Sequence, residues 1–243
     1  MFPDSVIAYI AAAVIAYLLG SVSGAIVSSR VGHKEDIRNY GSGNAGMTNA
    51  LRTYGIRHAA IVAMIDIVKT ILAIVIADRL IGWKWGFLIG SLCAITGHLF
   101  PVFYKFKGGK GVLCGLASLL MVDWRIGVLV VAVFAVCVAF TRRVSVGSIF
   151  ACLSAPLWCH LLKVDPVHTV YVLLAASWLI WCHRSNIRRL LRGEEPKTVF
   201  RDAGSAFPEE AIPGKAPAKE DTGWKKDNRY GVPEKPLYRR RHG

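Results

Sequence analysis

Charged residues are scarce in this sequence of 243 residues. They make up 19% of it, and several stretches of about 18–25 residues contain almost none, which is long enough to cross roughly 30 Å of hydrocarbon. Hydrophobic residues account for 53%, and the mean hydropathy is +0.41. This composition excludes an ordinary soluble domain and indicates a membrane protein.

Sequence patterns of metal and redox sites are also missing. The six cysteines are scattered through apolar runs with no Cys-x-x-Cys pair, so we interpret them as small hydrophobic residues. There is no His-Glu-x-x-His segment, no array of paired carboxylates and no Cys/His cluster. We therefore expect no protein-held metal and no cofactor. The start of the chain, MFPDSV, lacks the basic segment of a cleavable signal peptide.

What the sequence does contain is a series of apolar runs separated by short loops. These runs predict an all-α, polytopic membrane protein with about seven transmembrane helices. The predicted spans cover residues 5–28, 58–80, 85–105, 111–122, 125–141, 147–163 and 166–182. The fourth is short and depends most on its neighbours.

Lysine and arginine are divided unevenly between the two sets of loops. Fourteen lie in loops that would share one face, and four lie in loops of the other face. Positively charged loops stay on the cytoplasmic side, so the amino terminus is predicted outside and the carboxyl terminus in the cytoplasm. The formal net charge is +14, and its placement between spans favours anionic ligands and membrane lipids over nucleic acid.

The composition changes after the last span. Residues 1–192 are predicted to form one transmembrane domain. Residues 193–243 are rich in proline, glycine, lysine and glutamate with few large aliphatic side chains, so we expect a charged, disordered cytoplasmic tail. Nothing in the sequence identifies a protein partner.

The first candidate site is a loop that reads GSGNAGMTNALRTYG, residues 41–55. Glycine lets backbone N–H groups close on an oxyanion, and Arg52 is suited to a bidentate grip on phosphate. Close helix packing would also use small residues, but this loop is too polar for packing alone. Its candidate ligands are Gly41, Ser42, Gly43, Asn44, Thr48, Asn49 and Arg52.

The second candidate site is the loop GHLFPVFYKFKGGKG, residues 97–111. Gly108 and Gly109 are predicted to expose N–H groups to an anion, with Lys110 at the positive start of the next helix. The spacing of a nucleotide-binding phosphate loop is absent, so a nucleotide is not indicated. His98 lies near the end of the preceding span, where helix packing and a direct role are both open.

Two later segments add polar residues to the same predicted face. In TRRVSVGS, residues 141–148, Arg142 and Arg143 are orientation signals or site residues, and Ser145 is a candidate helix cap. In CHRSNIRRLLRG, which follows the last span, His183 and Asn186 have the spacing to face one pocket.

One charged pair lies inside a predicted span. Asp66 and Lys69 are three residues apart, and charged groups within a membrane segment are functional candidates by default. We favour a structural ion pair that orients the helix.

Four segments, taken in order, resemble the motifs of the bacterial acyl-phosphate:glycerol-3-phosphate acyltransferase family. They are GSGNAGMTNALRTYG, GHLFPVFYKFKGGKGV, TRRVSVGS and HRSNIRRLLRG. The resemblance covers about residues 17–194 and implies a seven-helix enzyme of phospholipid biosynthesis in the bacterial inner membrane. It implies acyl transfer from fatty acyl phosphate to the sn-1 hydroxyl of glycerol 3-phosphate, with lysophosphatidate and inorganic phosphate as products.

Carried over by position, the resemblance also implies a site. Its catalytic group would be Ser42, Arg52, Lys110, His183 and Asn186. Substrate and phosphate binding would fall to Gly41, Gly43, Asn44, Thr48, Asn49, His98, Gly108 and Gly109. The general base stays open between His183 and a substrate phosphate oxygen.

Two other functions remain open on the residues alone. A transporter or channel for an organic phosphate would use similar loops, but it would need polar groups on both faces, and the outer loops are plain. A CDP-alcohol phosphotransferase would need an aspartate-rich metal motif, which the sequence lacks.

Overall fold

The computed structural model describes residues 6–197, which lie within one compact unit, Met1–Phe200. The described residues contain helices and no strand, which confirms the predicted all-α class. The α-helices are α1 (Val6–Gly20), α2 (Gly24–His33), α3 (Met47–Tyr54), α4 (Ile56–Ile81), α5 (Trp83–Leu99), α6 (Val112–Val122), α7 (Trp124–Thr141), α8 (Val144–Leu161), α9 (Pro166–Cys182) and α10 (Arg184–Leu191). Two short 3-10 helices are η1 (Ile37–Asn39) and η2 (Val102–Tyr104).

Within residues 6–197, four helices are long and apolar enough to cross a membrane, namely α4, α7, α8 and the segment Trp83–Tyr104 that contains α5. The count rises to six if two bent pairs each form one span. These pairs are α1 with α2, bent by 41°, and α9 with α10, bent by 55°. The α6 helix is shorter, as expected for the fourth predicted span. Seven crossings and the orientation remain predictions.

The first predicted span, 5–28, differs from the structure because it is interrupted. Residues 21–23 are not helical, and Ser23 caps α2 by accepting a hydrogen bond from the Ile26 N–H. The predicted span carried its apolar character through Ala25, Ile26 and Val27, although the break itself reads GSVSG, residues 20–24. The break matters because it brings backbone groups to the buried charges of α4.

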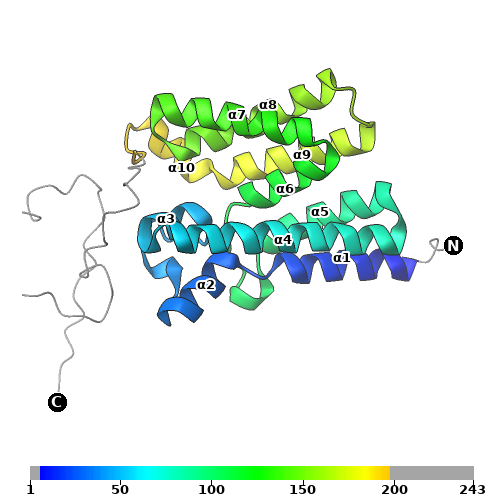
Figure 1. Ribbon diagram of the computed structural model, residues 1–243, viewed down its shortest axis with the longest axis horizontal. Helices are drawn as coiled ribbons and strands as arrows, with labels where there is room; N and C mark the ends of the chain where they lie inside the picture. The colour runs from blue at the N-terminus through cyan, green and yellow to red at the C-terminus, as the bar shows by residue number, and fades with distance from the viewer. Residues whose placement is uncertain (1–5, 198–243) are drawn as a thin grey trace, which may run out of the picture. The chain divides into compact units, whose positions relative to one another are not determined.

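Helices α1, α4 and α5 pack against one another, and α7, α8 and α9 continue the bundle, with α6 between the two groups (Figure 1). Small residues allow the closest contacts: a side chain on Gly20 would collide with the backbone of Ala94, and one on Gly97 with the backbone of Tyr17. Such contacts are typical of helices packed in lipid. The first candidate loop, which leads into α3, and the junction of α9 with α10 lie at one end of this bundle (Figure 1).

Candidate active site

The first candidate loop is organised by Asn49. This side chain is 1% exposed, accepts a hydrogen bond from the Ser42 N–H at 2.9 Å and donates to the Tyr40 carbonyl at 3.0 Å. Gly41 has a φ of +56°, and a Cβ there would collide with the Asn49 carboxamide. The sequence predicted Asn49 as a substrate ligand, whereas its polar atoms are bonded to the loop backbone. Asn49 therefore holds the backbone of the loop in its conformation.

The other residues of this loop are more accessible. Gly41, Ser42, Gly43 and Arg52 are exposed, and Asn44 and Thr48 are half-buried. The loop leads into α3, whose buried residues Asn49 and Ala50 face the cluster formed with Ile26, Ile37 and Val62. This packing leaves Arg52 on the accessible side of α3.

The glycines of the second loop do not act as predicted. The Gly108 N–H donates to the Leu99 carbonyl at 3.1 Å, and the Gly109 N–H donates to the His98 carbonyl at 3.1 Å. These amides close the loop onto the end of α5, so they are not free to bind an anion. Glycine is needed because a Cβ at Gly109 would collide with the His98 ring and the Ala45 carbonyl.

Lys110 is half-buried, and its ammonium donates to the Asn186 side-chain oxygen. Burial lowers its pKa to about 8; the positive charges of Arg189 and Arg52 act in the same direction, and Glu195 opposes them. Removing a charged amine from water disfavours its protonated form. The charge of Arg52 is therefore close enough to Lys110 to act on its pKa.

His183 and Asn186 lie where α9 ends and α10 begins, and both are buried. The Nδ1 of His183 is 2.8 Å from the Leu179 carbonyl oxygen. Because a carbonyl can only accept, Nδ1 carries the proton. Burial lowers the pKa of His183 to about 4, so the ring is neutral and keeps a free electron pair on Nε2. The charge of Lys110 also acts on His183, so the structure brings together Lys110, His183, Asn186 and Arg52.

One residue of this cluster was not predicted from the sequence. Glu195 was assigned to the tail, but its side chain is buried and accepts hydrogen bonds from Ser145, Asn186 and Arg189, each at 2.7 Å. Burial raises the pKa of Glu195, and these three bonds outweigh it and hold the pKa below its usual value. The membrane domain therefore extends past residue 192. The remaining tail, residues 198–243, lies outside the described residues.

Ser145 and Arg143 thereby gain defined positions. Ser145 donates to Glu195 rather than capping α8, and the Arg143 guanidinium donates to the Glu195 carbonyl at 3.0 Å. Arg142 is exposed at the end of α7. Glu195 thus joins the third and fourth sequence motifs, and a glutamate directly after a basic helix was the available signal.

The predicted ion pair of Asp66 and Lys69 is confirmed, with 2.8 Å between Nζ and Oδ1. Both residues are buried in α4, and His98 from α5 joins them. The cluster lies directly behind the second loop, because the His98 ring contacts Gly109.

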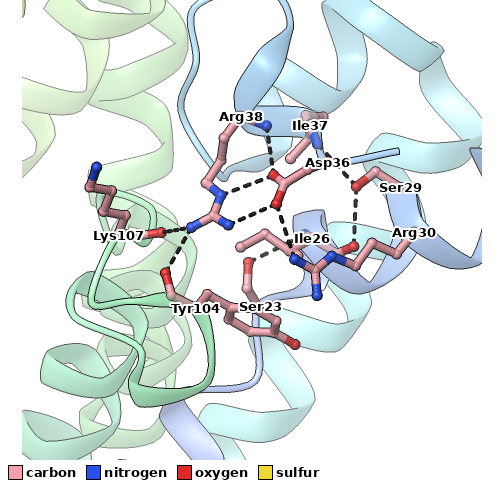
Figure 2. Close-up of polar contacts among 9 residues, drawn as sticks. All are labelled: Ser23, Ile26, Ser29, Arg30, Asp36, Ile37, Arg38, Tyr104 and Lys107. Carbon is pink, nitrogen blue, oxygen red and sulfur yellow. Dashed lines mark hydrogen bonds and ion pairs between the residues drawn. The ribbon is translucent and has the colours of Figure 1, made fainter. Parts of the chain in front are cut away.

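Arg38 connects the two candidate loops, as Figure 2 shows. Its guanidinium donates to Asp36 on its own segment and to the carbonyls of Tyr104 and Lys107, at 2.8 Å and 3.0 Å. The hydrogen bond from Arg38 holds the pKa of Asp36 at about 2. The Arg38 guanidinium is bonded both to Asp36 and to the Tyr104 and Lys107 carbonyls. It therefore fixes the distance between the segment before the first loop and the second loop.

Residues 6–197 contain no group of three or more His, Cys, Asp or Glu side chains that could hold a metal ion. The site consists of cations, amides and imidazoles at one end of an apolar helical bundle. Chemically, this arrangement can bind phosphate groups and accept a proton.

Comparison with known proteins agrees with this chemistry. The sequence model of a family described as glycerol-3-phosphate acyltransferase matches residues 10–193. The chain belongs to the glycerol-3-phosphate acyltransferase family. Among relatives named glycerol-3-phosphate acyltransferase, that of Gloeobacter violaceus is 40% identical over 185 residues, covering 74% of this chain and 90% of the relative. That of Clostridioides difficile is 39% identical over 198 residues, covering 79% and 96%.

Solved structures of the family have the same fold. PlsY (YgiH), described as an integral membrane glycerol 3-phosphate acyltransferase, was crystallised in a glycerol 3-phosphate form. It has a TM-score of 0.72 and 32% identity, covering 79% of this chain and 96% of that one. The lysophosphatidic acid form has a TM-score of 0.71 and 31% identity, covering 78% and 94%.

Proposed function

We propose that this family member transfers a fatty acyl group from acyl phosphate to the sn-1 hydroxyl of glycerol 3-phosphate, releasing lysophosphatidate and inorganic phosphate. The observation that carries the proposal is the hydrogen bond from Lys110 to Asn186, next to the buried His183. The positive charge of Arg52 also acts on Lys110. Both substrates are phosphorylated, and two cations can hold two anions next to each other.

Side chains, more than loop amides, would bind the phosphates. The amides of Gly108 and Gly109 are used within their loop, so Arg52 and Lys110 are the phosphate ligands, with the exposed Ser42 and the half-buried Asn44 and Thr48 nearby in sequence. Gly41 and Gly43 give their loop its shape at positive φ. Asn49 acts through Ser42, whose N–H it holds.

The chemical step needs positioning more than covalent catalysis. Phosphate is a good leaving group, so the acyl carbonyl is already activated, and the protein has to hold the reactants in attack geometry and stabilise growing negative charge. The free electron pair on His183 Nε2 supports a role in accepting the hydroxyl proton. A substrate phosphate oxygen is the alternative base.

The proposed location is the bacterial inner membrane, with the site on the cytoplasmic face. The positive-inside distribution of lysine and arginine supports this orientation, and glycerol 3-phosphate would then reach the loops from the cytoplasm. The acyl chain would lie among the apolar helices. We propose residues 1–197 as the catalytic unit, because Glu195 belongs to its buried polar cluster.

Release of inorganic phosphate by the purified protein tests this function. We expect release only when acyl phosphate and glycerol 3-phosphate are both present, and release that continues with EDTA. Acyl-CoA in place of acyl phosphate is expected to give no product, which mass spectrometry of lysophosphatidate would check. Acylation by acyl-CoA alone, or uptake of glycerol 3-phosphate into sealed liposomes without acylation, would contradict the proposal.

A further inference from the structure

Lys69 has as many acceptors around it as it has protons to donate. Its Nζ lies 2.6 Å from the Val22 carbonyl, 2.8 Å from Asp66 Oδ1 and 2.9 Å from His98 Nδ1. An ammonium carries three N–H groups and cannot accept a hydrogen bond. All three protons are therefore used, and each acceptor is fixed in its role.

This arrangement decides the tautomer of His98. Because the ammonium donates to Nδ1, that nitrogen must be unprotonated, and the ring proton lies on Nε2. A proton on Nδ1 would instead face the ammonium at 2.9 Å, while the Asp66 carboxylate is farther away, at 3.5 Å. Asp66 supports the arrangement from the other side, since it balances the lysine charge and also accepts from the Gly24 N–H at 3.3 Å.

The Nε2 side of His98 faces the contact between the two candidate loops. A Cβ on Gly109 would collide with His98 Nε2 on one side and would press on the Ala45 carbonyl on the other. Nε2 therefore lies where the first loop, which leads to Arg52, meets the second loop, which leads to Lys110. The His98 backbone carbonyl accepts from Gly109 in the same place.

We propose that Asp66 and Lys69 are positioning residues for acyl transfer: they hold His98 as a hydrogen-bond donor at Nε2, at the junction of the two loops. This inference rests on the proposed function, and it gives the buried ion pair a role beyond orienting α4. A structural role alone, in which Lys69 and Asp66 only satisfy the backbone at the α1–α2 break, would not depend on the residue at position 98.

The tautomer can be observed without any turnover. Histidine labelled with 15N in the detergent-solubilised full chain gives separate signals for protonated and unprotonated ring nitrogens. The chain has seven histidines, and the signal lost in His98→Gln assigns His98. We expect a protonated Nε2 and an unprotonated Nδ1. A protonated Nδ1, alone or together with Nε2, would overturn the proposal.

Kinetics provide the second measurement. A glutamine amide nitrogen lies where His98 Nε2 lies, whereas an asparagine amide nitrogen lies nearer to Nδ1. We expect the turnover of His98→Asn to be at least about tenfold below that of His98→Gln, since displaced groups near a reacting centre cost up to about 10²-fold. Equal turnover of the two variants would contradict a donor at Nε2.

A double-mutant cycle then links Lys69 to His98. Lys69→Met is expected to lower turnover about tenfold in the wild-type background and clearly less in the His98→Gln background, because residues that act through one another are not additive. Equal losses in both backgrounds would reduce Lys69 to a structural residue. Ser91→Ala, which removes a buried hydroxyl on the same helix as His98, controls for lost stability and should leave turnover unchanged.

The two proposals can fail separately. If wild-type protein with a protonated Nε2 on His98 releases no phosphate from acyl phosphate, the proposed function is wrong and the tautomer stands. If the protein acylates glycerol 3-phosphate while His98 is protonated on Nδ1, the function stands and the positioning role is wrong.

Discussion

The part of the chain that the structure describes contains two lysine–histidine clusters, and they differ in how many hydrogen bonds the lysine makes. Lys69 makes three short hydrogen bonds, to Val22, Asp66 and His98, and its side chain is 5% exposed. Within the described residues Lys110 makes one, to Asn186, and it is half-buried with a lowered pKa. A saturated cation has no donor left for a ligand, whereas Lys110 has two. The comparison separates a lysine that supports the site from one that can bind substrate.

The two histidines differ in the same sense. His98 accepts a hydrogen bond from Lys69 at Nδ1, whereas His183 donates one to the Leu179 carbonyl from Nδ1. One ring therefore presents a donor at Nε2 and the other an acceptor. The tautomer of each ring is set by the partner of its Nδ1, which is the Lys69 ammonium for His98 and the Leu179 carbonyl for His183. Identical side chains thus acquire opposite chemistry.

Each cluster also lies beside a bend in a helix pair. Lys69 and Asp66 bond to Val22 and Gly24 at the α1–α2 bend, and His183 and Asn186 lie at the α9–α10 bend. Breaks free backbone groups that need partners in an apolar bundle. At the first bend side chains supply those partners, and at the second the bend itself turns His183 and Asn186 toward Lys110.

The largest effect is expected when the unsaturated lysine is removed. Lys110→Ala should lower turnover by about 10² or more, because a charge that stabilises the reacting phosphates is lost, and it should leave the melting temperature nearly unchanged. Phosphate-release kinetics and thermal unfolding measure the two quantities. Lys107→Ala is the matched control: it removes an exposed cation of the same loop and should keep wild-type turnover.

Nearly normal turnover in Lys110→Ala would break the comparison, since the cation with free donors would then be dispensable. A large loss of stability in Lys110→Ala would also contradict the comparison, because it would show that Lys110 supports the fold as Lys69 does.

The sequence predicted much of this site, and the physical reasons for the failures are specific. Lys110, His183 and Asn186 were found because polar residues at the ends of apolar runs are conspicuous. Glu195 was missed because composition averages over a segment and does not report one buried contact. Gly108 and Gly109 were predicted as anion ligands, but glycine composition does not reveal whether an N–H is already bonded.

The ion pair of Asp66 and Lys69 was predictable from spacing along one helix. Its third member, His98, was not, because that contact joins α4 to α5 and depends on how closely these helices pack. The break after Gly20 was not predicted for a similar reason: its backbone groups at Val22 and Gly24 are bonded by side chains from α4, a contact between distant segments.

A smaller effect is expected from pH, and it sharpens the assignment of Lys110. With a pKa of about 8, Lys110 is mostly charged at pH 7 and mostly neutral at pH 9. The KM for glycerol 3-phosphate should therefore rise about tenfold between these values, because about one unit above the pKa only a tenth of the amine remains charged. Initial rates across this range measure it.

Lys110→Arg provides the control for this titration. Arginine stays protonated throughout the range, so the rise in KM should disappear in this variant even if its overall activity is lower. The same rise in Lys110→Arg would assign the transition to another group and leave Lys110 without its proposed role.

The smallest effect on turnover is expected at Arg38. This variant tests whether the two candidate loops depend on the hydrogen bonds that Arg38 makes between them. Arg38→Met removes the hydrogen bonds to the Tyr104 and Lys107 carbonyls, and should lower the free energy of unfolding by about 1–3 kcal/mol. Turnover should change less than about threefold, because Asn49 and the end of α5 still hold each loop separately.

Arg30→Met is the comparison for that measurement. Arg30 also pairs with Asp36, but its side chain is 53% exposed, and such pairs contribute about 0–1 kcal/mol. If Arg38→Met lost as much turnover as Lys110→Ala while remaining folded, the spacing of the loops would matter as much as the charge within them. The saturated cluster behind the loops and the unsaturated one in front would then act as a single unit, coupled through the segment that Arg38 holds in place.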